Sequence, residues 1–215
     1  ALEEKTILFK PLDSRLGLAI DAAHHYIAEM TDINALQQAL EAFTPTLEPE
    51  DKDKKDMLAL LKTPNPYART QFEPGHFTAS AFVLNPPLDS MLLIFHEKLK
   101  MWLQPGGHIE VSDLTLEAAA RRELLEETGV SSPKLHPGVH GIVAIDIHDI
   151  PARKTEPTHK HFDIRYLYIA QDHQYKAASD ALDARWVKLG AIAELQTDAS
   201  VLNTVTRIQS LLLKP

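Results

Sequence analysis

The sequence predicts an α+β fold in which a mixed sheet lies between helices and is preceded by a small helical segment. Apolar residues recur at helical spacing up to about Tyr67, whereas short alternating or uniformly apolar runs dominate from Phe77 onward. Two later stretches, Thr115–Thr128 and Ser200–Leu213, return to helical spacing. Strands interleaved with few helices are typical of a sandwich in which helices cover a sheet.

Composition and charge limit the classes of function. Of the 215 residues, 44% are hydrophobic and 24% are charged, as in ordinary globular proteins. The net charge of −8 disfavours binding to a nucleic-acid backbone, although a metal ion could still attract a small anionic substrate. The chain has no cysteine, its apolar runs are too short to cross a bilayer, and Ala1–Lys10 does not resemble a signal peptide. We therefore expect a cytoplasmic protein that binds neither nucleic acid nor membrane.

The N-terminal segment is expected to form three helices. The second is capped by Asp32, and the third begins near Pro49 with a solvated charged face, Glu50–Asp56. Thr63–Pro66 breaks the pattern, so we predict a helical extension over residues 1–67 and a second domain over 68–215. Three short helices cannot bury their apolar faces alone, so we expect them to pack on the second domain or on another subunit, with a homodimer preferred. The first helix carries its apolar residues at Leu16, Ala19, Ile20, Ala23 and Ile27.

The second domain is expected to contain a series of strands. In the first, Phe77, Ala79, Ala81 and Val83 lie on one face and the intervening residues on the other. A turn at Pro105–Gly107 ends the third run. The expected strands are Phe77–Leu84, Met91–Phe95, Lys100–Leu103, Val139–Ile147, Ile164–Ala170 and Ala184–Leu189.

The stretch with the clearest chemistry is the helix expected over Thr115–Thr128, with Thr115 as N-cap and Gly129 after its end. Its residues Glu123, Glu126 and Glu127 are three or four positions apart and share a face. Such carboxylates repel one another unless a cation lies among them, and oxygen ligands suit Mg²⁺. The preceding Arg122 can hold a carboxylate by two hydrogen bonds.

This stretch resembles the Nudix box, the signature of the Nudix hydrolases. The matching residues are Gly107, Arg122, Glu123, Leu124, Glu126, Glu127, Gly129 and Val130. The spacing departs at one point, since Asp113 stands where the family has Glu and eight residues, not seven, separate it from Arg122. The simplest explanation is one extra residue before the helix. The order of the expected strands is also similar to the Nudix α/β/α sandwich.

The resemblance implies hydrolysis of a pyrophosphate bond in a nucleoside diphosphate linked to another moiety, such as a sugar nucleotide or dinucleotide. It also implies a Mg²⁺ or Mn²⁺ cofactor. By position, Glu126 and Glu127 match the metal ligands, Glu123 a ligand or base, and Arg122 the residue that orients them. The carbonyl of Gly107 matches a further metal ligand.

A second polar group lies outside the box. His159, His161, Asp163 and Arg165 alternate along an expected strand and therefore share a face. We predict substrate contacts from His159, Asp163 and Arg165, and we favour Glu156 or His161, in or beside the polar segment Ala152–His161, over Glu123 as general base. The alternative is an exposed polar strand edge without a role in catalysis.

Two rival functions remain open from the residues. A Nudix-like domain could bind a ligand without catalysis, although the presence of both Glu126 and Glu127 disfavours a pure sensor. An isomerase acting on a diphosphate substrate is the third hypothesis. His108, beside the box glycines, is interpreted as a positional variant and not as a ligand, because Mg²⁺ prefers oxygen.

Overall fold

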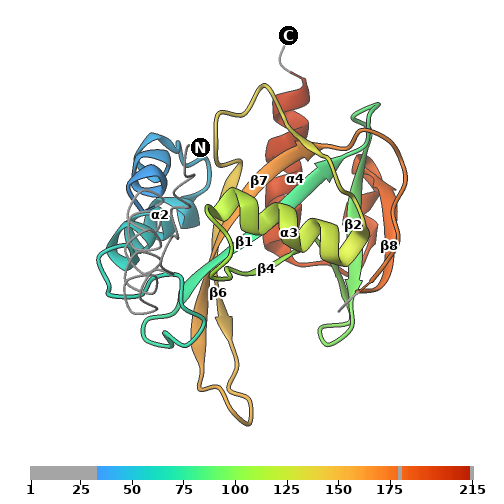
Figure 1. Ribbon diagram of the computed structural model, residues 1–215. Coiled ribbons are helices and arrows are strands. Elements are labelled where there is room, and N and C mark those ends of the chain that lie inside the picture. The colour runs from blue at the N-terminus through green and yellow to red at the C-terminus, as the bar shows by residue number, and fades with distance from the viewer. Residues whose placement is uncertain (1–32, 179–180, 214–215) are drawn as a thin grey trace, which may run out of the picture.

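A computed structural model describes residues 33–178 and 181–213 of the chain (Figure 1). The first expected helix, Leu16–Ile27, and the expected cap Asp32 lie outside these residues. Residues 33–42 are helical, and helix α2 spans Glu48–Leu60. Within the described ranges, no helix has the length and apolar character needed to cross a membrane.

The centre of the molecule is an eight-stranded mixed sheet. Strands β1 and β7 run parallel in its interior, and every other pairing is antiparallel. Strand β6 lies beside β7, and β2 connects β1 to β8 and β3. The strands are β1 (His76–Leu84), β2 (Ser90–His96), β3 (Met101–Leu103), β4 (Gly106–His108), β5 (Lys134–Leu135), β6 (Ala144–Ile150), β7 (His159–Ile169) and β8 (Ala181–Lys188).

Helices cover both faces of this sheet, as the expected α/β/α sandwich requires. Helix α3 (Leu116–Thr128) crosses one face, and α4 (Ala199–Leu212) lies behind the other, preceded by the 3₁₀ helix η1 (Leu189–Glu194) (Figure 1). Alternation along β1 divides the core as the sequence predicts. Phe77 and Ala79 join the cluster beneath α3, whereas Phe82 and Leu84 join the cluster beneath α4.

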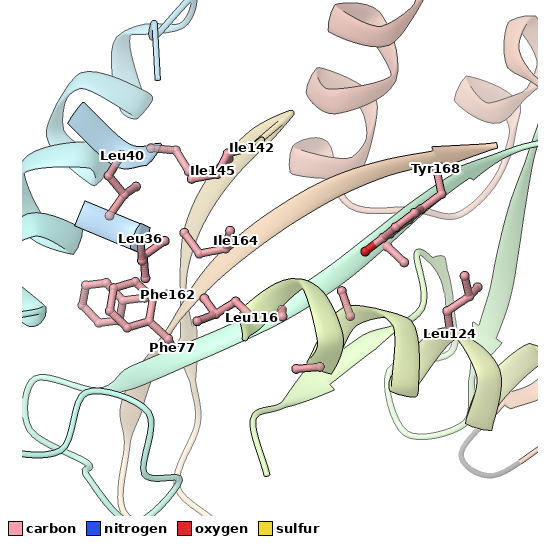
Figure 2. Packing of buried hydrophobic residues seen from close by; sticks show 14 of the residues in the cluster. Leu36, Leu40, Phe77, Leu116, Leu124, Ile142, Ile145, Phe162, Ile164 and Tyr168 are labelled. Carbon is pink, nitrogen blue, oxygen red and sulfur yellow. The ribbon is translucent and has the colours of Figure 1, made fainter. Parts of the chain in front are cut away.

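The N-terminal helical region packs on the sheet of the same chain. Leu36 and Leu40 are buried in the cluster that contains Phe77 and Phe162 (Figure 2). The prediction that the charged residues of α2 face solvent is wrong for Glu50, which is buried and forms an ion pair with Arg207 of α4 at 2.5 Å. A buried carboxylate needs such a partner. The division at residue 67 and the homodimer remain predictions.

Strands β4 to β8 differ from the sequence expectation, in which β5 has no counterpart and β8 begins at Ala184, three residues later than in the structure. Strand β6 begins at Ala144 and not at Val139, because the preceding loop turns through Gly141, whose φ of 101° is unfavourable for other residues. Gly106 and Gly107 form the short strand β4 against β1 and are not only a turn. Strand β7 begins five residues earlier than expected, at His159, so its polar residues also belong to the sheet.

Candidate active site

Helix α3 begins and ends where its caps dictate. The Oγ1 atom of Thr115 accepts a hydrogen bond from the backbone N–H of Ala118 at 3.0 Å. Gly129 ends the helix in the left-handed region, with φ of 70°. These caps confirm the expected helix and fix which of its residues face β4.

The guanidinium of Arg122 is the centre of an ionic network. Its Nη1 atom donates to Glu123 at 3.0 Å and to Glu126 at 3.1 Å. Its Nη2 atom donates to the carbonyl of His108 at 2.8 Å and to Asp113 at the same distance. Hydrogen bonding to Asp113 is the largest effect on the pKa of Arg122 and raises it. Arg122 therefore connects two acidic residues of α3 to the loop that precedes the helix.

The two glycines of β4 allow the backbone to approach the acidic face of α3. The N–H of Gly106 donates to Oε2 of Glu127 at 3.0 Å. A Cβ atom built on Gly107 would lie 2.6 Å from Oε1 of Glu123, so a larger residue would displace this carboxylate. Burial raises the pKa of Glu123, against the effect of Arg122.

This arrangement fits a divalent cation of the Mg²⁺ class. The carboxylates of Glu123 and Glu127 both lie beside the backbone of β4. Glu126 is half exposed, and its carboxylate and that of Glu123 accept hydrogen bonds from the same guanidinium, that of Arg122. Carboxylate and carbonyl oxygens are the ligands that Mg²⁺ and Mn²⁺ accept. The carboxylate of Glu123 occupies the space that a Cβ atom at Gly107 would need, as expected where a backbone atom and a carboxylate approach a shared ion.

Asp163 and Arg165 lie in the protein interior, with side chains only 2% and 3% exposed. Arg165 donates from Nε to Asp163 at 2.9 Å and from Nη1 to Thr204 of α4 at 3.0 Å, and it pairs with Asp146 at 3.1 Å. Ser80 donates to Asp163 at 2.9 Å. These contacts join the sheet to α4, and the substrate contacts expected from Asp163 and Arg165 remain predictions.

His159 and His161 belong to a group of five imidazole rings on the same face of the sheet. Parallel pairing places His161 opposite His76, and antiparallel pairing places it opposite His148. The ring centroid of His161 lies 4.9 Å from that of His76, 5.0 Å from His108, 5.3 Å from His159 and 5.5 Å from His148. Because β7 is an interior strand, the alternative of an exposed polar edge is wrong.

Most of these rings are held in the neutral form. Burial and neighbouring imidazoles lower the pKa of His161 to about 2 and that of His108 to about 4. Burial also lowers the pKa of His76. His148 differs: burial is the largest single effect and lowers its pKa, but the hydrogen bond with Asp146 and the negative charges of Asp163 and Asp146 together raise it. A neutral imidazole keeps one nitrogen lone pair available.

Glu156 lies in the hairpin between β6 and β7, which extends away from the sheet (Figure 1). Its carboxylate accepts a hydrogen bond from Arg69 at 3.1 Å, and this contact lowers its pKa. The structure thus brings Glu156 together with Arg69, whereas Glu123 lies with Arg122 on α3. The three candidate bases, Glu123, Glu156 and His161, have different immediate partners.

Sequence reasoning missed two residues and left a third without a role. His76 went unnoticed, although alternation along β1 places it on one face with Thr78, and Arg69 had no recognisable motif. The sequence assigned Asp113 to the Nudix box but indicated no interaction for it, and the structure shows that it pairs with Arg122. The grouping of His76 with His161 depends on a parallel pairing between strands 85 residues apart, which no local pattern reveals.

Comparison with known proteins agrees with this geometry. Residues 74–207 match the NUDIX domain model. A probable DHNTP pyrophosphohydrolase of Lactococcus lactis subsp. cremoris (strain MG1363) is 32% identical over 125 residues, covering 57% of this chain and 71% of that protein. Phosphatase NudJ of Escherichia coli (strain K12) is 53% identical over 36 residues, covering 17% of this chain and 23% of its own length.

Solved structures show the same fold. A NUDIX-family hydrolase of Clostridium perfringens superposes with a TM-score of 0.52 at 23% identity, covering 64% of this chain and 97% of that one. The NUDIX domain of Shewanella oneidensis NrtR, solved with ADP ribose, superposes with a TM-score of 0.51 at 17% identity, covering 63% of this chain and 87% of that one. The family model spans more than half of the chain and includes the whole of α3, and the chain therefore belongs to the Nudix hydrolase family.

Proposed function

We propose that this protein is a Mg²⁺- or Mn²⁺-dependent pyrophosphohydrolase whose substrates are nucleoside diphosphates linked to another moiety. The observation that carries the proposal is the position of Glu123 beside Gly107 and its hydrogen bond with Arg122, which present a half-buried carboxylate beside the backbone of β4. The relative from Lactococcus lactis is named a pyrophosphohydrolase, which supports the same reaction class.

Each residue of the network has a distinct role in this proposal. Glu126, Glu127 and the carbonyl of Gly107 are the metal ligands, with Glu123 beside them. Arg122 restricts the Glu123 and Glu126 carboxylates through its hydrogen bonds, and Asp113 restricts Arg122 in turn. A divalent cation at this site supplies positive charge to the phosphates and lowers the pKa of a bound water molecule.

We place the general base at Glu123, which differs from the preference for the hairpin that the sequence suggests. Glu123 shares a helix face with the proposed ligands and touches Gly107. Glu156 is instead paired with Arg69, and His161 is surrounded by other imidazoles. A general base must reach the attacking water, and position on the acidic face favours Glu123 on this criterion.

A hydrolysis screen tests the proposal. Sugar nucleotides, ADP ribose, dinucleotides and DHNTP are incubated with the protein and Mg²⁺ or Mn²⁺, and phosphate-containing products are identified. We expect Glu126→Gln and Glu127→Gln to remove most activity while the fold is retained. Glu194→Gln, an exposed change outside α3, is the matched control.

The outcomes separate the rival functions. Metal-dependent turnover of any of these substrates that is lost in the two α3 variants supports the proposal. Nucleotide binding without turnover supports the ligand sensor, and a rearranged diphosphate without hydrolysis supports the isomerase. Turnover that is unchanged in both α3 variants at saturating metal overturns the metal assignment.

The cellular location and assembly expected from the sequence are proposals as well. The absence of cysteine supports a cytoplasmic protein. The homodimer is tested by sedimentation equilibrium of the full chain, and a mass equal to one chain contradicts it.

A further inference from the structure

We propose that His76, His159 and His161 form a binding site for a transition-metal ion of the Zn²⁺ class, separate from the cation proposed at α3. One nitrogen of each ring lies within 4.8 Å of the others. The three residues come from the adjacent parallel strands β1 and β7. This inference stands independently of the proposed hydrolysis.

The hydrogen bonds of His76 and His159 use Nδ1 and leave Nε2 available to bind a metal ion. Nδ1 of His76 lies 3.1 Å from the carbonyl of Gln71, and Nδ1 of His159 lies 2.8 Å from the carbonyl of Pro157. A carbonyl oxygen only accepts, so each Nδ1 carries a proton, and in the neutral ring Nε2 then keeps its lone pair. In a metal-bound histidine, the ring nitrogen that does not bind the metal usually donates its N–H to a backbone carbonyl or carboxylate. This hydrogen bond fixes the orientation of the ring and its tautomer.

Two of the imidazole nitrogens have no hydrogen-bond partner among the described residues. These are Nε2 of His76 and Nε2 of His161, and both atoms are buried. His76 itself is 0% exposed. A buried polar atom without a partner destabilises the folded protein, and a bound ion would satisfy both atoms at once.

The ligand type selects the class of ion. Imidazole nitrogens favour Zn²⁺, Ni²⁺ or Cu²⁺, whereas the carboxylates of α3 favour Mg²⁺ or Mn²⁺. Three histidines with a further position open to solvent or a fourth ligand are a recurrent zinc arrangement. The ring of His108 is a further neighbour, with its centroid 5.2 Å from that of His76 and 5.0 Å from that of His161. A tetrahedral zinc site with 2.0–2.1 Å bonds needs about 3.4 Å between ligand nitrogens, so binding of an ion would draw the three rings together from their present separations of up to 4.8 Å.

Cobalt provides the test, because Co²⁺ bound by several imidazoles gives visible absorption bands that report its coordination. Co²⁺ is titrated into the chelator-treated full chain, and Zn²⁺ is then added to displace it. We expect one strong site per chain, with affinity reduced more than about 100-fold in His159→Gln and in His161→Gln, beyond the usual effect of losing an outer-shell contact. The exposed His140→Gln is the matched control and should bind as the unmodified chain does.

The design distinguishes this site from the one at α3. Glu126→Gln should keep the cobalt bands, even though the proposed function predicts that it loses activity. Bands that disappear in Glu126→Gln but persist in both histidine variants would place the ion on α3 and overturn the proposal. Failure to bind Co²⁺ or Zn²⁺ stoichiometrically in the folded wild-type chain would overturn it as well.

A measurement without substitutions covers the case in which a histidine variant does not fold. Long-range ¹H–¹⁵N spectra of the uniformly labelled wild-type chain resolve the ring nitrogens with and without Zn²⁺. We expect Nε2 of His76 and of His159 to change on Zn²⁺ addition, while their Nδ1 atoms stay protonated. Rings that do not respond to one equivalent of Zn²⁺ contradict the assignment.

Discussion

Asp113 accepts three hydrogen bonds from Arg122, from Nη2 to Oδ2 at 2.8 Å and from Nε to Oδ1 at 3.1 Å and to Oδ2 at 3.2 Å. The Asp113 side chain is 6% exposed and also accepts the backbone N–H of Glu110 at 2.8 Å, which closes the turn before α3. The residue that departs from the family pattern therefore anchors the arginine that orients Glu123 and Glu126. The extra residue in the loop is compatible with this pairing.

Weakening this anchor should reduce activity without unfolding the protein. Asp113→Asn loses the charge that holds the guanidinium, and Arg122→Lys loses the planar donors that reach several acceptors. We expect each change to reduce kcat about 10–100-fold and to raise the Mg²⁺ concentration needed for half-maximal activity. Arg121→Lys, at a residue bound to Glu117 and not to Asp113, should leave the Mg²⁺ dependence unchanged. Equal Mg²⁺ dependence in all three variants would contradict a positioning role.

Substitution of Gly107 should reduce activity more than stability. The atoms that meet a new Cβ atom belong to the far end of the Glu123 side chain, which can move away at small cost in stability. That movement takes the carboxylate from its position beside β4. Gly190→Ala is the matched control, since its Cβ would meet nothing within 4 Å. Thermal unfolding and initial rates are measured on both, and a Gly107→Ala variant with wild-type kcat would show that Glu123 need not occupy this position.

The general base can be identified by comparing three variants across pH. Loss of the base should cost about 10²–10⁴-fold in kcat. We expect this loss in Glu123→Gln and smaller effects in Glu156→Gln and His161→Ala. If Glu156→Gln or His161→Ala instead removes the pH dependence of kcat, the hairpin or the adjoining strand supplies the base.

Asp53 should make the folded protein less stable as the pH rises. Burial and the nearby Asp146 raise its pKa from 3.8 to about 6. Between these values the folded state binds more protons than the unfolded state, so the free energy of unfolding falls as pH increases through this window. Asp53→Asn should therefore raise the melting temperature above pH 6 and have little effect below pH 3.8.

A control on the same helix isolates this effect. Asp51 is exposed in the first turn of α2, where a negative charge interacts favourably with the helix dipole. Asp51→Asn should lower stability by about 0.3–1 kcal/mol at neutral pH, opposite in sign to Asp53→Asn. Stability that does not depend on Asp53 between acid and neutral pH would refute the raised pKa.

Because the N-terminal region packs on the sheet, we expect a cavity between them to lower the free energy of unfolding substantially. Leu40 is 0% exposed in the cluster that contains Phe77 and Phe162. Leu40→Ala should lower the free energy of unfolding by about 2–5 kcal/mol in urea titrations. Leu182→Ala, at a residue 54% exposed, should change it by less than about 0.5 kcal/mol. A similarly small loss in Leu40→Ala would mean that this region contributes little to the stability of the fold.

The sequence by itself determined the features that depend on local spacing. The caps Thr115 and Gly129 and the positions of Glu123, Glu126 and Glu127 follow from residues within one helix, where hydrogen bonds and side-chain periodicity are local. Alternation along β1 likewise separated the residues that face α3 from those that face α4. The helical spacing of residues Ser200–Leu213 also predicted α4, which spans Ala199–Leu212.

Tertiary structure alone decided which distant residues share a site. Whether His159, Asp163 and Arg165 are exposed depends on the neighbours of β7, and the sheet places β1 on one side of it and β6 on the other. This order brings His76 beside His161 and surrounds Asp163 and Arg165 with the interior of the protein. Periodicity within a strand reports the face on which a residue lies, but strand pairing between distant segments determines what lies opposite it.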